Sequence, residues 1–145
     1  MGGAKAYNPA GGFDHYEFEH DGEYITVGGV KAIVVVKIGD ENHHSGTPIH
    51  SQTPDTVYIT VQGKEKTPVQ LKVFEGRTAL KDFDWDHTHT DKSTGKVYPK
   101  GVVHVQMYDK NGTRDHLHAR YMNNAEMKQY GPMIRFLFPG VKFRP

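Results

Sequence analysis

A chain of 145 residues has the size of one ordinary domain and is long enough to bury a core without covalent staples. Its 18 Lys and Arg residues against 17 Asp and Glu leave a formal charge of +1, which excludes a surface that is basic throughout and built for polyanions. The absence of cysteine excludes disulfides, thiolate nucleophiles and cysteine-ligated zinc. No apolar run approaches the roughly 20 residues that a membrane helix needs, so no membrane span is expected.

The order of polar and apolar residues predicts an N-terminal extension, 1–22, followed by one histidine-rich α+β domain, 23–145. Residues 1–22 are rich in Gly, His and acids and have little periodicity. Farther on, alternation of apolar and polar residues is clear, and Gly28-Gly29 suits a tight hairpin. The predicted strands are 23–27, 30–38, 56–62, 69–75, 77–85 and 101–108. Two long polar stretches, 39–55 and 86–100, are expected to be loops, and long loops are often functional.

A helix is predicted after these strands. Asn123 is a good N-cap, and Glu126 three residues later completes a capping box. Apolar residues follow at helical spacing, but Gly131-Pro132 is expected to break the helix into two pieces. The fold class is therefore α+β: an antiparallel β-sheet meander with a C-terminal helix packed on one face. Three aromatic residues near the end are assigned to the core: Phe136, Phe138 and Phe143.

The chain has ten histidines, and the strongest cluster of chemical side chains follows the predicted strand 77–85. Residues 82–90 read Asp-Phe-Asp-Trp-Asp-His-Thr-His-Thr, so the acids would share one strand face and the aromatics the other. Continued strand geometry would place His87 and His89 together opposite the acids, and an Asp–His pair would need a turn at Asp86. His104 could supply a third imidazole from the next strand. Such histidines suit a metal ion or metal-free acid–base catalysis equally, and a solvated loop with chance histidines is the plain alternative.

Two weaker groups of residues flank this cluster. Segment 42–53 is rich in His, Ser and Thr, and its backbone amides and hydroxyls, including that of Ser45, could bind an anion such as a phosphate beside His43 or His44. A network of Asx and Ser turns explains that segment equally well. Lys100 and Arg120 flank the histidines and could neutralise a phosphodiester, although basic residues are often plain solvated surface.

The order of these motifs resembles a known family. HSGTP at 44–48, DFDWDHTH at 82–89 and KGVVHV at 100–105 resemble an uncharacterised C-terminal domain of bacterial polymorphic toxins and phage head-morphogenesis proteins. The resemblance covers about residues 30–144 and implies a toxin-type nuclease, an RNA substrate and an immunity protein as partner. It also implies secretion or delivery into a target-cell cytoplasm, although the first residues lack a signal peptide's apolar region. Gln106 departs from the family pattern, which has a histidine there, and this weakens a four-histidine metal site.

Three functional hypotheses follow. The leading hypothesis is a cofactor-free ribonuclease that uses histidine acid–base catalysis. Its roles are distributed as follows: general base His87 or His89, general acid His104 or His44, orienting carboxylate Asp84 or Asp86, and substrate contacts Ser45, Lys100 and Arg120. The second is a nuclease that depends on a divalent metal ion held by His87, His89 and His104. The third is a binding module of a phage particle or secretion system, without enzyme activity, whose histidines form a pH-dependent interface.

Overall fold

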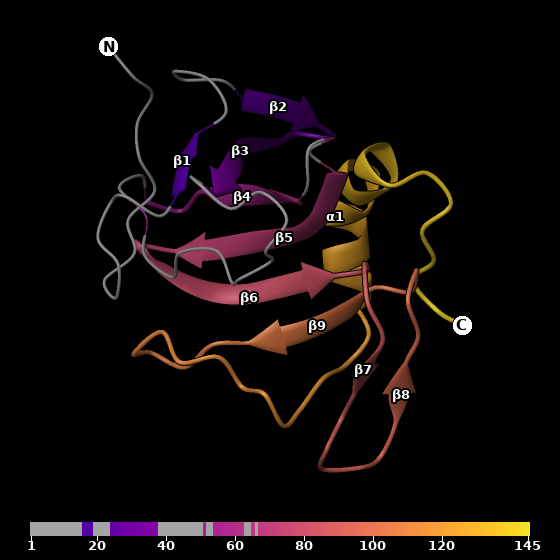
Figure 1. The fold of residues 1–145 in the computed structure, drawn as a ribbon. Helices are drawn as coiled ribbons and strands as arrows, with labels where there is room; N and C mark the ends of the chain where they lie inside the picture. The colour runs from indigo at the N-terminus through magenta and orange to yellow at the C-terminus, as the bar shows by residue number, and fades with distance from the viewer. Residues whose placement is uncertain (1–15, 19–23, 38–50, 52–53, 63–64, 66) are drawn as a thin grey trace.

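The computed structural model describes residues 16–18, 24–37, 51, 54–62, 65 and 67–145. Within them, a seven-stranded sheet has the order β1-β3-β4-β5-β6-β9, and β2 also pairs with β3 (Figure 1). Its strands are β1 (Tyr16–Phe18), β2 (Tyr24–Val27), β3 (Val30–Lys37), β4 (Val57–Gln62), β5 (Thr67–Glu75), β6 (Thr78–Asp84) and β9 (His104–Met107). The short strands β7 (His89–Thr90) and β8 (Val97–Tyr98) form a separate hairpin, and α1 (Asn124–Leu137) follows β9.

The predicted antiparallel sheet with a C-terminal helix is confirmed. Strands β4, β5 and β6 form an antiparallel meander. Among the strand pairs of the described sheet, β3 with β4 is parallel and the others are antiparallel. Parallel neighbours cannot be joined by a tight hairpin, and β3 ends at Lys37 whereas β4 begins only at Val57. Strand β1 lies within the range predicted as an N-terminal extension and pairs with β3, Phe18 opposite Val35.

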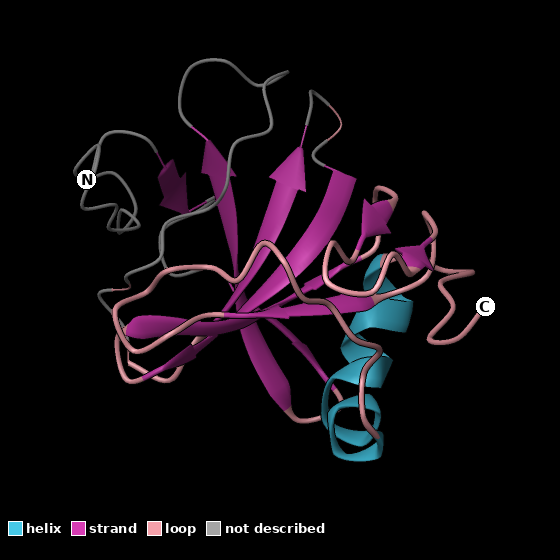
Figure 2. Ribbon diagram, turned by 90° about the horizontal axis from the view of Figure 1, so that it is seen from below, coloured by secondary structure: helices cyan, strands magenta, loops and turns pink. Residues whose placement is uncertain are grey.

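Alternation along the strands gives the sheet two different faces. One face is apolar and is covered by α1, which lies across one side of the sheet in Figure 2. The helix packs against β2 and β3 and buries Tyr130, Met133 and Ile134 in the main core. Burial of each such side chain contributes on the order of 1.5–3 kcal/mol. The strand residues of this core are Val30, Ala32, Val34, Val57, Ile59, Leu71, Val73, Phe83 and Val105.

The helix runs unbroken through Pro132, so the predicted break at Gly131-Pro132 is wrong. Proline in a helix interior removes one backbone hydrogen bond, but tertiary packing outweighs that cost here. The Pro132 ring lies against the turn between β2 and β3, where a Cβ added to Gly28 would be 3.0 Å from the Pro132 Cβ. Gly28 also has a φ of 61°, so this turn suits glycine for two reasons.

Some other predictions at the C-terminal end are also corrected. Phe136 is 61% exposed rather than in the core, whereas Phe143 is buried and Phe138 packs partly buried against the core. The predicted strand 101–108 begins only at His104, because residues 101–103 pair with the C-terminal segment through Lys142.

The predicted loop 86–100 contains β7 and β8. In the described part of the chain, no helix is long and apolar enough to cross a membrane.

Glu126 ties the helix to the sheet. It completes the predicted capping box with Asn123, whose side chain accepts from the Glu126 backbone N–H at 2.8 Å. Its carboxylate also accepts from Lys81 Nζ on β6 at 2.7 Å and from Arg120 Nη1 at 2.6 Å. One buried carboxylate therefore joins the helix start, strand β6 and the segment before the helix.

We predict that Glu126→Gln removes an acid-sensitive part of the stability. Burial raises the pKa of Glu126, but hydrogen bonds from Arg120, Lys81 and Asn123 outweigh it and lower that pKa from 4.5 to about 2. Because the folded-state pKa is depressed, this stabilisation is complete above pH 4.5 and is lost as the pH falls toward 2. The loss on mutation at neutral pH is on the order of 2–3 kcal/mol.

Urea unfolding at a series of pH values measures this effect. Glu126→Gln should flatten the dependence of unfolding free energy on acid pH, whereas Glu75→Gln, at an exposed position on β5, should not. An unchanged pH dependence in Glu126→Gln would contradict the assigned contacts.

Candidate metal centre

The face of the sheet away from α1 carries an unusual set of buried polar side chains. Strand register places them in two rows that run across four strands. One row is Thr60, Gln70, Asp84 and His104, and the other is Tyr58, Lys72, Asp82 and Gln106. Each of these eight side chains is almost fully buried. We call the two rows the polar layer.

The first row is a chain of hydrogen bonds that ends beside a histidine. Thr60 Oγ1 donates to Gln70 Oε1 at 3.1 Å, and Gln70 Nε2 donates to Asp84 Oδ1 at 2.7 Å. The other oxygen of Asp84 accepts from Arg114 Nη2 at 2.8 Å and lies 3.7 Å from His104 Nε2. The Asp84 carboxylate is therefore fixed from several sides, and it faces the imidazole ring.

The second row balances the charge of the layer. Lys72 Nζ lies 3.0 Å from Asp82 Oδ1, and the Tyr108 hydroxyl donates to Asp82 Oδ2 at 2.6 Å. Arg114 Nε lies 3.4 Å from the same Oδ2. Burial raises the pKa of Asp82, and the Lys72 ammonium opposes that rise most strongly. Lys72 and Arg114 together match the two carboxylates Asp82 and Asp84, as buried charges require.

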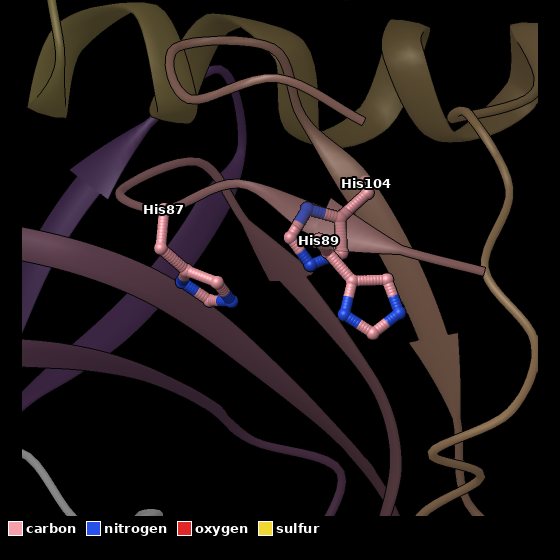
Figure 3. Close-up of side chains that lie close together, drawn as sticks. All are labelled: His87, His89 and His104. Carbon is pink, nitrogen blue, oxygen red and sulfur yellow. The ribbon is translucent and has the colours of Figure 1, made fainter. Parts of the chain in front are cut away.

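Three of the four predicted site histidines meet at the His104 end of the polar layer: His87, His89 and His104. Strand β6 ends at Asp84, and the chain bends at Asp86 and His87 before β7 begins at His89. The turn at Asp86 that an Asp–His pair would need is therefore present, and His87 Nδ1 lies 2.7 Å from Asp86 Oδ1. Figure 3 shows the three imidazoles converging on one region.

The cluster geometry is tight. One candidate ligand atom from each of His87, His89 and His104 lies within 4.8 Å of the other two. The His89 and His104 rings are stacked with centroids 4.9 Å apart, and His87 stands edge-on to His104 at 5.2 Å. Neither ring nitrogen of His104, nor Nε2 of His89, makes a well-formed hydrogen bond with a described residue. Buried polar atoms without partners are costly, so this arrangement is poised for a ligand.

The environment keeps two of the rings neutral. Burial, aided by the neighbouring histidines and Arg114, lowers the pKa of His104 to about 3, and the nearby Gln106 side chain opposes this only weakly. Burial likewise lowers the pKa of His89, with Arg114 and His87 adding to the effect. The hydrogen bond with Asp86 raises the pKa of His87, against a smaller effect of burial. Neutral imidazole is the form that binds a metal ion.

The cluster can hold one divalent ion of the kind that imidazole nitrogen prefers, such as zinc. Asp86 on His87 and Asp84 near His104 stand where outer-shell carboxylates orient histidine ligands in metal sites. His104 fits poorly as a general acid, because a neutral ring at pH 7 has no imidazolium proton to give.

The remaining predicted site residues have different positions. Lys100 lies close to the cluster, since its backbone N–H donates to Thr88 Oγ1 at 3.3 Å. Arg120 is engaged with Glu126 through both terminal nitrogens. His44 and Ser45 lie outside the described residues, so their roles stay predictions.

Sequence reasoning missed most of the polar layer. Gln70 and Lys72 alternate with apolar residues on β5, which is also the pattern of a strand with one solvated face. The available signal was the pair of acids Asp82 and Asp84, because two carboxylates within one strand of the core require cations nearby. No protein-family model, curated protein or solved structure matches this chain.

We predict that the protein binds one zinc ion per chain through this cluster. His89→Ala should weaken binding more than about 100-fold, and Asp86→Asn by roughly 10–100-fold, as losing a ligand and an outer-shell partner would. His116→Ala is the matched control, because that exposed histidine lies outside the cluster. Calorimetric titration with zinc measures all four proteins, and equal affinities for His89→Ala and His116→Ala would contradict the site.

We also predict strong coupling inside the polar layer. Asp82→Asn leaves the buried Lys72 ammonium without its carboxylate and should cost about 3–5 kcal/mol of unfolding free energy. Adding Lys72→Met removes that buried charge, so the double variant should be clearly more stable than the sum of the single effects predicts. Urea unfolding of the four proteins gives the coupling, and additive losses would show that the pair is not linked.

Proposed function

We propose that this chain is a metal-dependent hydrolase domain that cleaves phosphodiester bonds, with one ion held by His87, His89 and His104. The observation that carries the proposal is the convergence of three imidazoles, two of which have buried nitrogens that make no well-formed hydrogen bond with a described residue. This choice favours the metal-dependent nuclease over the cofactor-free ribonuclease that the sequence suggested first.

The donor set supports a catalytic rather than a purely structural ion. Structural zinc sites usually have four protein ligands, whereas catalytic sites have three and keep an open position. Among the described residues, three side chains form the cluster, and His87 is 45% exposed. An ion here would therefore be reachable from solvent on the His87 side.

In such a site the ion supplies Lewis acidity and lowers the pKa of a coordinating water to about 7. The residues of this chain contribute orientation and charge. Asp86 holds the Nδ1 side of His87, so Nε2 would be the nitrogen left to bind an ion. Asp84, itself fixed by Gln70 and Arg114, faces the His104 ring.

Local charge supports a phosphodiester as substrate. The net charge of the whole chain is close to zero, but residues 87–103 contain three lysines and one acid. That acid, Asp91, is occupied by hydrogen bonds from Ser93, Thr94 and Ala119. The lysine side chains Lys92, Lys96 and Lys100 are exposed and give this segment a positive surface. The resemblance to toxin-type nuclease domains points to the same substrate, and an RNA preference, an immunity partner and delivery into a target cell stay predictions.

A second candidate is the cofactor-free ribonuclease. It is favoured by the contact of the half-exposed His87 with Asp86, which is the arrangement of an oriented acid–base histidine. In that case His87 would be the group that accepts and donates protons during the reaction. The buried His104 would only hold the His87 ring in position.

We predict metal-dependent cleavage of a nucleic acid by the purified protein. Single-stranded RNA, single-stranded DNA and duplex DNA should be compared by gel electrophoresis, with zinc, manganese or magnesium and with EDTA. The expected result is cleavage that EDTA abolishes and added metal restores. His89→Ala should lower the rate at least about 100-fold, and His116→Ala should leave it unchanged.

The other outcomes separate the two candidates. Cleavage that survives EDTA but is lost in His87→Ala would replace the metal mechanism with the acid–base one. A protein that binds zinc yet cleaves none of the three substrates would contradict the nuclease function and leave the metal site intact.

A further inference from the structure

A cavity opens on the outer side of the segment that carries the histidines. Its volume is about 450 Å³, within the roughly 300–1,000 Å³ typical of small-molecule sites. It lies where β5 begins, β6 has just ended and α1 gives way to the C-terminal segment. The residues that line it are Thr67, Pro68, Val69, Trp85, Asp86, Lys100 and Phe138.

The cavity and the metal centre share a wall. Asp86 lines the cavity, and its Oδ1 lies 2.7 Å from His87 Nδ1, so this side chain contacts both sites. Lys100 also lines the cavity, and its backbone N–H donates to Thr88 Oγ1 at 3.3 Å. A substrate group in this cavity would therefore lie next to a group held at the ion.

The chemistry of the walls selects a class of occupant. Pro68, Val69, Trp85 and Phe138 make most of the lining apolar; Phe138 is half-buried, whereas Trp85 is only 1% exposed and presents a small part of its ring to the cavity. The Trp85 indole donates to the Pro68 carbonyl at 3.2 Å, which fixes that ring in place. Lys100 adds one exposed cation at the rim, and it forms no ion pair with a described residue. Aromatic walls with a cation at the edge suit a flat heterocycle joined to a phosphate.

We propose that this cavity holds a nucleobase of the substrate strand, beside the phosphodiester at the metal centre, with Lys100 contacting a phosphate. The proposal rests on the proposed function, because it assigns a position and a selectivity to that substrate. It makes the cavity the place where base preference is set, whereas the histidines act on the backbone that all bases share.

Trp85 gives a direct measurement, because it is the only tryptophan of the chain. Its fluorescence, excited at the red edge where nucleobases are transparent, should report occupancy of the cavity. The probes are the four nucleoside 3′-monophosphates, the matching nucleosides and ribose phosphate, added to metal-free protein. The expected result is a saturable change with at least one nucleotide, weaker binding of its nucleoside and no response to ribose phosphate.

Two pairs of variants localise the effect. Thr67→Phe fills the cavity from an exposed position and should abolish the response, whereas Thr26→Phe, at an exposed position on β2, should not. Lys100→Ala should weaken nucleotide binding on the order of tenfold or more, to the level of the nucleoside. Lys110→Ala, an exposed lysine away from the cavity, should leave the affinity unchanged. Thermal unfolding of each variant checks that the fold is intact.

The outcomes also distinguish this proposal from the proposed function. No fluorescence response, a response that Thr67→Phe leaves intact, or equal binding of ribose phosphate would overturn the base-binding cavity, even if the protein cleaves nucleic acid. A response lost in Thr67→Phe, in a protein that cleaves no substrate, would support the cavity and contradict the nuclease.

Discussion

The pairing of buried charges on one face of the sheet is the constraint on which the rest of this structure depends. Lys72, Asp82, Asp84 and Arg114 lie at or beneath the surface of the sheet, and none of these charges could stay there alone. Arg114 comes from the segment after β9, which folds back along that strand through the bridges at Tyr108 and Val105. The ion pairs of Arg114 therefore hold this segment against the strands, beside the polar layer.

The proposed metal centre follows from this arrangement. Asp84 and His104 face each other because β6 and β9 pair in that register, and the neutral His104 ring completes the polar row without adding charge. The bend at Asp86 and His87 then brings two more imidazoles over the same ring. A metal site needs its ligand side chains held at fixed distances by well-packed, hydrogen-bonded neighbours. The charge-balanced polar layer beneath the histidines provides such neighbours.

The two faces of the sheet have different roles: one stabilises the fold by hydrophobic burial, and the other carries the residues of the proposed site. The apolar face under α1 contributes most of the hydrophobic burial, and Glu126 links that helix to β6 through Lys81. The polar face carries the residues that could act on a substrate. Residues 85–104 connect the faces, since Trp85 belongs to the core while His87, His89 and Lys100 belong to the proposed site and its cavity.

The sequence by itself determined the elements whose signals are local. Alternation along the strands, the capping box of Asn123 and Glu126, and the spacing of His87 and His89 could all be interpreted without coordinates, because each depends on neighbours a few residues away. Only the tertiary structure decided what depends on distant neighbours. The parallel pairing of β3 with β4, the unbroken helix at Pro132 packed on Gly28, and the burial of Lys72 against Asp82 are set by contacts between separate segments. The sequence named His87, His89 and His104 as one candidate set, but their proximity depends on the register of β6 and β9, which places His104 beside Asp84 and which local sequence does not fix.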